Sequence, residues 1–214
     1  MPRAQHVSRM SGTHKPSRRE RRRIETRERI FHAALQLFAE RGFAPTTVEH
    51  ITEAADVGKG TFFNYFPSKE HVFGVMTEIQ LGKVGEGVAE AEEGASSIEK
   101  VVDRLFHRLA EEPGRSPALA RGLMSALVGS DQVRQLASNA MAEGRKRLTR
   151  IFTLGQKQGE IRRDRKPEAM AWIFQQTLFG TIVLWTIQPE TPLKPRIDQS
   201  FEYFWAAIAS RGSR

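Results

Sequence analysis

Residues 56–70 read DVGKGTFFNYFPSKE, and the five positions 62–66 carry four aromatic rings in a chain in which only 8% of residues are aromatic. On a helical wheel of about 100° per residue, Phe62, Phe63 and Phe66 fall within one sector of about 100°. The opposite sector holds three polar residues: Thr61, Asn64 and Tyr65. Because a helix of about two turns is not stable alone, the pattern predicts that the phenylalanines dock it on neighbouring helices while its polar side faces outward.

Two further helices are predicted just upstream. A stripe at helical spacing predicts the first, formed by Ile30, Ala33, Ala34, Leu37 and Phe38. Gly42 predicts a left-handed end for it, and Phe43 is placed for the hydrophobic contact that accompanies such an end. Thr46 followed by Glu49 has the spacing of a capping box, which predicts the start of a second, short helix. A turn containing Gly58 then leads into the aromatic helix, an arrangement typical of a helix-turn-helix, whose second helix enters the major groove of DNA.

The rest of the chain also shows helix signals. Capping-box spacings, prolines at first helical positions and a terminating glycine mark the boundaries: Ser17 with Glu20, Ser96 with Glu99, Ser116-Pro117, Lys166-Pro167 and Gly159. Apolar residues recur at helical spacing between these signals, and the last such helix covers about 197–208. The sequence shows no alternating strand pattern and no internal repeat. The predicted fold class is therefore all-α, with about nine helices.

The positive charge is concentrated at the N-terminus. Residues 1–29 carry ten Lys or Arg and three Glu, whereas residues 30–214 carry 23 basic and 22 acidic side chains. The run RRERRR at 18–23 favours a polyanionic partner, either nucleic acid or an acidic membrane surface, and a solvated, disordered tail is the alternative. The chain has no cysteine, which excludes disulfides and thiolate metal sites. Since the N-terminus also lacks the apolar segment of a secretory signal, we expect a cytoplasmic protein.

Residues 37–73 resemble the DNA-binding domain of the TetR family of bacterial transcriptional regulators. The match extends over about 24–83 and is specific in its order: Leu-Phe, then Gly-Phe-x-x-Thr-Thr-Val-x-x-Ile, then Lys-Gly-Thr-x-x-x-Tyr-Phe-x-x-Lys-Glu. The resemblance implies a homodimer in which each subunit places 60–66 in the major groove. It divides the chain into a basic, disordered arm at 1–23, a DNA-binding domain at 24–84 with its helix-turn-helix at 47–66, and a C-terminal ligand-binding and dimerisation domain at 85–214.

The resemblance also implies which residues contact DNA. Thr46 or Thr47 would bind a phosphate at the start of the second helix, and Lys59 and Lys69 match the family's backbone-contacting lysines. The reading positions are those of the polar sector, where Asn64 can pair with N6 and N7 of adenine. The other candidates are Gly60 and Phe63 in the aromatic helix and, for the backbone or minor groove next to the half-site, Arg18, Arg19 and Arg22.

Three residues depart from the family's pattern. Asp56 stands where Gly is usual, so that an Asp must adopt the left-handed conformation. Gly58 stands where Ser commonly caps the recognition helix. Phe63 replaces a frequent Tyr whose hydroxyl reaches phosphate, and two roles stay open for it: contact with DNA or packing in the core.

The longest uncharged run, 169–189, approaches the length of a membrane span. Gln175 and Gln176 near its middle disfavour that interpretation, because desolvating two amides in hydrocarbon is unfavourable. The resemblance implies instead that 169–188 and 196–210 form the four-helix bundle of the dimer, with these interface residues: Leu178, Ile182, Trp185, Phe201, Phe204 and Trp205.

The remaining helices supply candidates for an effector pocket: Leu105, Phe106, Leu109, Met124, Phe152, Trp172, Gln176 and Phe179. Aromatic residues and methionine at helical spacing are more often plain core, so the two interpretations stay open for each. His107 and Gln176 are the candidates for polar contacts. The scarcity of charge among these residues favours an apolar or weakly polar effector.

The sequence does not indicate an enzyme. Its six histidines show no metal-ligand spacing, the stretch GKGT at 58–61 lacks the phosphate-binding loop pattern, and no Gly-x-Ser-x-Gly occurs. We therefore expect no catalytic residues, no metal and no cofactor. The predicted function is that of a ligand-responsive repressor that binds a palindromic DNA operator as a homodimer. A non-specific architectural DNA-binding protein without effector control is the alternative.

Overall fold

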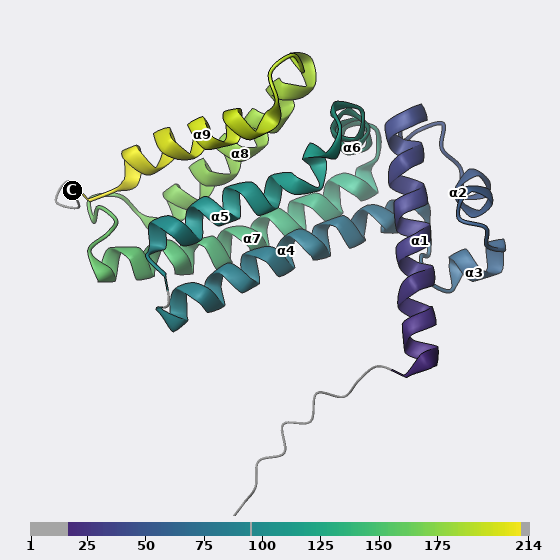
Figure 1. Cartoon of the computed structure of the whole chain (residues 1–214), viewed down its shortest axis with the longest axis horizontal. Helices are drawn as coiled ribbons and strands as arrows, with labels where there is room; N and C mark the ends of the chain where they lie inside the picture. Colours follow the sequence, from purple (N-terminus) through teal and green to yellow (C-terminus); the bar gives the residue numbers. More distant parts are fainter. Residues whose placement is uncertain (1–16, 95, 211–214) are drawn as a thin grey trace, which may run out of the picture.

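The computed structural model describes residues 17–94 and 96–210. Within these ranges the chain forms nine α-helices and one short 3-10 helix, η1, which confirms the predicted all-α class (Figure 1). The helices are α1 (Arg18–Arg41), α2 (Val48–Ala54), α3 (Lys59–Phe63), α4 (Lys69–Glu93), α5 (Ile98–Glu111), η1 (Pro113–Arg115), α6 (Pro117–Gly129), α7 (Asp131–Gln158), α8 (Pro167–Ile187) and α9 (Leu193–Ile208).

Two apolar cores share the chain, and α4 belongs to both. The first core joins α1, α2, α3 and the N-terminal part of α4 to α6 and the start of α7. The second joins the rest of α4 to α5, α7, α8 and α9. In Figure 1 the first group stands at one end of the molecule and the second forms an elongated bundle beside it. The expected domain boundary at 84/85 therefore falls inside a continuous helix.

Most predicted helix ends agree with the structure, and two capping residues were wrong by one position. Both reciprocal bonds of the Ser17 capping box are present, with Glu20 as the partner. The cap of α2 is Thr47 with His50 and not Thr46 with Glu49, because the Thr46 hydroxyl donates back to the Gly42 carbonyl at 2.7 Å. His50 fills the role through its ring nitrogen, which accepts from the Thr47 N–H.

The same one-residue shift occurs at α5, where Ser97 and not Ser96 caps the helix. The predicted starts at Pro117 and Pro167 and the stop at Gly159, with φ of 83°, are confirmed. The last helix begins at Leu193, earlier than predicted, since Pro195 lies in the first turn, where no intrahelical N–H bond is required.

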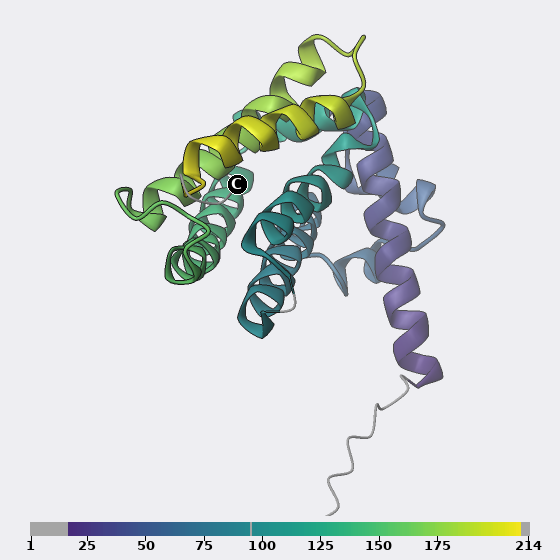
Figure 2. The same ribbon diagram turned by 60° about the vertical axis from the view of Figure 1, so that its left-hand side comes forward.

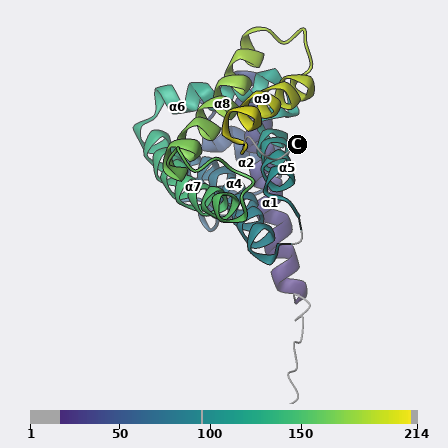
Figure 3. The ribbon, with the colours of Figure 1, turned by 90° about the vertical axis from the view of Figure 1, so that its left-hand side faces the viewer.

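The N-terminal half of α1 extends away from both cores. Figures 2 and 3 show this end of the helix projecting beyond the other helices. Residues 18–29 are exposed except for the partly buried Thr26. Residues 18–23 of the expected arm are thus helical, while residues 1–16 lie outside the described residues.

A close crossing joins α1 to α6. A Cβ atom at Gly122 would lie 2.3 Å from the carbonyl oxygen of Phe38, so that only glycine allows the two backbones to approach this closely. Gly122 is followed by Leu123 and Met124, which face the centre of the molecule. Helix α6 therefore contacts α1, which carries α2 and α3 in the first core, backbone against backbone.

Among the described residues, one helix, α8, is long and apolar enough to cross a membrane by length and composition. It packs instead against α6, α7 and α9. Its buried side includes Phe174, Leu178 and Ile182, as expected for a helix of a protein core.

Candidate nucleic-acid interface and cavity

The short helix α3 is held by two of the three phenylalanines of residues 62–66. Phe62 and Phe66 are 0% and 1% exposed, and their ring centroids lie 5.6 Å apart within the first core. Phe63 is 53% exposed, which corrects the prediction that all three rings share the docking side. Of the two roles left open for Phe63, packing in the core is excluded, because the ring is exposed. Contact with DNA stays a prediction.

Of the three polar residues predicted to face outward, the structure fully exposes one. Asn64 is exposed, Thr61 is partly buried, and Tyr65 is partly buried against the first core. The helix ends at Phe63, so that Asn64 caps it and the helical segment is shorter than predicted. Asp56 has a φ of 48°, as the turn requires, and Gly58 caps α3 without a side-chain bond. Asn64 therefore offers an uncommitted amide at the surface.

Lys59 is held by an ion pair across the helix-turn-helix. Its Nζ lies 2.5 Å from Oε1 of Glu49 in the first turn of α2, and both side chains are more than half exposed. The hydrogen bond from Lys59 lowers the pKa of Glu49 to about 2. The contact with Glu49 uses one of the three ammonium donors of Lys59, and the side chain is exposed, so that donors are left for a phosphate.

Lys69 has a structural role that the sequence did not reveal. Its ammonium donates to the carbonyls of Phe43, Ala44 and Thr46 at 2.9, 3.1 and 2.8 Å and lies 4.5 Å from the Phe43 ring centroid. Desolvation by burial lowers its pKa, an effect that the nearby charge of Glu70 opposes. Because all three donors are used, Lys69 fastens the loop between α1 and α2 to the start of α4 and has no hydrogen left for a phosphate.

The two threonines at the start of α2 also differ. Thr46 is 0% exposed, and its hydroxyl is used within the loop, so the alternative of a phosphate contact falls to Thr47. Thr47 is exposed, and its hydroxyl accepts from the His50 N–H at 3.3 Å. Lys59, Gly60, Thr47 and Asn64 are all accessible to a duplex from the same pair of helices.

The arginines of α1 form a basic surface. On a helical wheel, one sector of about 140° contains five of them: Arg18, Arg19, Arg22, Arg23 and Arg29. All three glutamates of 18–29 lie outside this sector. Arg27, also outside it, pairs with Glu78 at 3.0 Å. A basic stripe about three turns long is thus available to a polyanion.

A cavity of about 210 Å³ lies between the two cores. Its walls come from α4, α5, η1, α6, α7 and α8: Phe73, Met76, Thr77, Gln80, Leu81, Val84, Leu109, Pro113, Leu123, Met124, Leu127, Ala137, Ala140, Met141, Gly144, Leu148, Phe174, Gln175, Leu178 and Phe179. No charged side chain is among them. The cavity is therefore suited to an apolar ligand body.

Three of the predicted pocket residues, Leu109, Met124 and Phe179, line this cavity. The others do not, and the structure corrects them. Leu105, Phe106 and Phe152 are almost fully buried in the second core. Phe106 and Phe152 contact the rings of α8 and α9, and the Phe106 and Phe174 centroids lie 4.5 Å apart. Leu105 packs instead beside Gly87 of α4. Trp172 and Gln176 are exposed on the outer side of α8.

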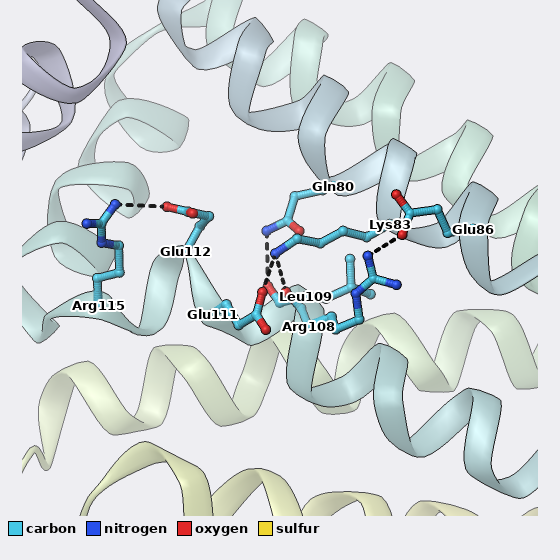
Figure 4. Close-up of polar contacts among 8 residues, drawn as sticks. All are labelled: Gln80, Lys83, Glu86, Arg108, Leu109, Glu111, Glu112 and Arg115. Atoms are coloured by element: carbon cyan, nitrogen blue, oxygen red, sulfur yellow. Dashed lines mark hydrogen bonds and ion pairs between the residues drawn. The ribbon is translucent and has the colours of Figure 1, made fainter. Parts of the chain in front are cut away.

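Polar contacts fix the cavity wall at the end of α5 (Figure 4). Gln80 donates to the Leu109 carbonyl at 3.0 Å, and Lys83 donates to the Arg108 carbonyl at 2.5 Å and to Glu111 at 2.9 Å. Carbonyls at a helix C-terminus lack intrahelical partners, so α4 satisfies the end of α5. His107, one turn earlier, is directed away from the cavity and bonds Asp198 of α9 at 2.6 Å.

Most of the residues predicted to form the dimer interface are buried within the subunit. Leu178, Ile182, Trp185 and Phe204 are between 4% and 8% exposed and belong to the second core. Phe201 and Trp205 stack at 6.3 Å and pack against that core. The large apolar side chains that α8 and α9 leave exposed are Trp172, Ile173, Phe179, Leu184, Ile187 and Tyr203.

Within residues 17–94 and 96–210, no group of three or more histidine or carboxylate side chains is placed to hold a metal ion.

Comparison with known proteins gives one consistent result. The sequence model of bacterial regulatory proteins of the tetR family matches residues 30–76. The transcriptional repressor DhaR of Mycobacterium sp. (strain GP1) is 26% identical over 168 residues, which cover 78% of this chain and 85% of that protein.

Solved structures agree with this assignment. FadR of Thermus thermophilus, a TetR-family transcriptional repressor, is 30% identical, and the match covers 83% of this chain and 92% of that one with a TM-score of 0.60. SmeT, the repressor of a multidrug efflux pump of Stenotrophomonas maltophilia, shares the fold at 21% identity, with a TM-score of 0.71 over 87% of this chain and 91% of that one.

The helix-turn-helix of α2 and α3, the exposed polar groups on it and the match to FadR over most of both chains lead to the same conclusion. The chain belongs to the tetR family of bacterial regulatory proteins and is a DNA-binding transcriptional regulator.

Proposed function

We propose that the protein is a ligand-responsive repressor that binds a palindromic operator as a homodimer. One observation carries the proposal: Phe62 and Phe66 fix α3 from beneath, while Asn64 and Phe63 are exposed on it. We assign base contact to Thr61, Asn64 and Tyr65 and phosphate contact to Lys59 and Thr47. Arg18, Arg19 and Arg22 would contact the backbone flanking the half-site.

The cavity supports control by an effector. FadR of Thermus thermophilus was solved in complex with lauroyl-CoA, so a related repressor of similar length holds a ligand with an apolar chain. Here the walls are mostly apolar and include residues of α4 and α6, two helices that also contact the DNA-binding side. A ligand that moves either helix can alter the separation of two α3 helices, which on DNA is about 34–36 Å.

The homodimer would form through the outward sides of α8 and α9. Ile173, Leu184, Ile187 and Tyr203 are 50–69% exposed there, and exposed large apolar side chains on adjacent helices are typical of interfaces. We also propose that the functional division of the chain runs through α4, whose first two turns belong to the DNA-binding part. Such a regulator acts in the bacterial cytoplasm, where the DNA is.

Selection of binding sites from random duplexes tests this function. The full-length protein should enrich a palindrome whose half-sites are about one helical turn apart. Enrichment of no sequence, with equal affinity for all duplexes, would support the non-specific architectural protein instead. If the selected operator binds equally well with and without every ligand that occupies the cavity, effector control is wrong while DNA recognition stands.

A further inference from the structure

The cavity opens at the seam between α7 and α8. Among the described residues that surround it, two are exposed: Met141 of α7 at 38% and Phe179 of α8 at 39%. The other lining residues are buried or partly buried. A ligand body inside the cavity would therefore direct its remaining end toward this seam.

Polar groups join the two helices at this opening. Gln175 of α8, a lining residue, donates from Nε2 to the Met141 carbonyl at 2.9 Å. Arg145 of α7 donates from Nη1 to Oε1 of the same glutamine at 3.1 Å. Its guanidinium also lies 4.0 Å from the ring centroid of Trp172. Neutral groups thus hold Arg145 one turn of α7 away from Met141.

The partners of the Arg145 guanidinium differ from those of the other cations along α7. Arg134, Lys146, Arg147 and Arg150 each pair with a carboxylate. Within the part of the chain that the structure describes, no carboxylate lies within ion-pair distance of Arg145. A guanidinium has five N–H donors, and the Gln175 bond uses one of them. A partly buried cation with spare donors therefore stands beside the opening of an apolar cavity.

We propose that the effector is an amphipathic monocarboxylate whose apolar body fills the cavity and whose carboxylate binds Arg145. The inference rests on the proposed function, in which this cavity is the effector site. Arginine binds carboxylates in bidentate geometry, and the stacked Trp172 ring keeps the guanidinium plane oriented for it. The carboxylate takes the place of Gln175 as partner of Arg145, and Gln175 keeps its bond to the α7 backbone.

The volume limits the size of the apolar body. A cavity of about 150 Å³ accommodates benzene, so about 210 Å³ accommodates an apolar group of about eight carbons. The apolar body of octanoate, about seven carbons, is close to this size and ends in one carboxylate. Its amide, octanamide, has the same number of heavy atoms and no charge, and the two form a matched pair of probes.

The test measures the affinities of octanoate and octanamide for the full-length protein by titration calorimetry at pH 8, without DNA. We expect octanoate to bind at least about tenfold more tightly, because a hydrogen bond to a charged group is stronger than one between neutral groups. In Arg145→Gln the two affinities should agree within about twofold, with octanamide unchanged. Arg150→Gln, which removes the same charge from the same helix but from the pair with Glu92, should keep the preference.

Equal affinities in the unmodified protein, a preference that survives Arg145→Gln, or binding of neither probe would each overturn the inference. Thermal unfolding of both variants controls for folding. Titration of the selected operator at saturating octanoate separates this inference from the proposed function. If octanoate binds in preference to octanamide but leaves operator affinity unchanged, the carboxylate site is supported and effector control is contradicted. If other ligands release the operator and show no preference for a carboxylate, effector control is supported and the carboxylate site is contradicted.

Discussion

The two parts of α4 serve surfaces of opposite chemistry. Its first two turns pack with Phe62 and Phe66 beneath a surface on which Asn64 and Lys59 face water. Its middle forms the wall of a cavity with Met76, Gln80 and Val84 among other residues. The first surface suits a polyanion and the second an apolar ligand, and one helix contacts both.

The difference also separates stability from binding. Phe62 and Phe66 hold α3 from the buried side, whereas Asn64 would contact DNA from an exposed position, so that either can be changed without the other. In the cavity the same side chains form the wall and part of the core, so a substitution there changes both. Variants of the DNA-binding end therefore give the cleaner tests of function.

The largest expected effect comes from the phenylalanines of α3. Phe62→Ala should lower the free energy of unfolding by about 3–5 kcal/mol, because the ring is fully buried and its removal leaves a cavity. Phe63→Ala removes the same ring from a half-exposed site where it contacts the edge of Phe62, and it should lower the free energy of unfolding by less than about 1.5 kcal/mol. Urea denaturation of both variants measures the contrast, and equal losses would contradict the description of α3.

The two lysines of the DNA-binding part should separate in a similar way. Lys69→Met should destabilise the protein by about 1.5–3 kcal/mol, since three loop carbonyls lose a charged donor, and should leave the salt dependence of operator binding unchanged. Lys59→Met should leave stability nearly unchanged and reduce the slope of log K against log salt by about one. Operator titrations between low and moderate salt, combined with denaturation, test the pair; a reduced slope for Lys69→Met would show that it contacts DNA.

A substitution at the crossing of α1 and α6 should have a smaller effect on stability, and its control substitution should change stability in the opposite direction. Gly122→Ala should cost about 1–3 kcal/mol, because the new methyl group overlaps the Phe38 carbonyl. Gly82→Ala, in α4, meets nothing within 4 Å and should stabilise by about 0.4–1 kcal/mol. Thermal unfolding distinguishes the two, and stabilisation by Gly122→Ala would mean that the helices are not in contact there.

The smallest effect concerns pH. Burial lowers the pKa of His107, but its hydrogen bonds with the Asp103 carbonyl and with Asp198, together with both carboxylate charges, outweigh burial and raise it above the usual value. A raised pKa means that the α5–α9 contact stabilises fully below about pH 6.5 and that this stability is lost as pH rises through the higher folded value. The change should be under about 1 kcal/mol, since the pair is partly exposed and Lys194 also binds Asp198.

Unfolding of the unmodified protein and of His107→Gln between pH 5.5 and 8.5, roughly the range over which histidine titrates, measures that contribution. The decline with pH should be smaller in the variant. An identical pH dependence in both would show that the His107–Asp198 pair adds no stability.

Signals between residues close in sequence predicted much of this structure. Capping residues, prolines at helix starts and glycine stops placed most helix ends, and the wheel of 60–66 placed Phe62 and Phe66 beneath Asn64. The errors at this level were small: Thr46 lost its capping role to Thr47 because its hydroxyl bonds back into the preceding loop. Phe63 lies about 100° around the helix from the buried Phe62, at the edge of the apolar sector, and is exposed.

Contacts between distant helices could not be predicted in the same way. Phe106 and Phe152 have the spacing of a pocket wall, but which side of a helix meets a cavity depends on how α5, α8 and α9 pack, and helical spacing does not contain that information. Lys69 matched a DNA-contacting lysine by position, whereas its three carbonyl partners are 23–26 residues away. No pattern near Arg145 in the sequence marked it as a candidate binding residue. The proposal for it depends on its position beside the cavity and on the absence of a carboxylate partner among the described residues, and both follow from the packing of α7 against α8.

Phe62 and Phe66 hold α3 in the core so that its polar residues can contact bases. The most direct test compares the Asn64→Ala variant with the unmodified protein and measures, for each, the ratio of its affinities for the selected operator and for a scrambled duplex. Loss of a bidentate base contact should reduce that ratio roughly five- to 150-fold, which corresponds to about 1–3 kcal/mol of discrimination, while the unfolding midpoint stays unchanged. An unchanged ratio in Asn64→Ala and in Thr61→Ala, with the fold intact, would contradict the claim.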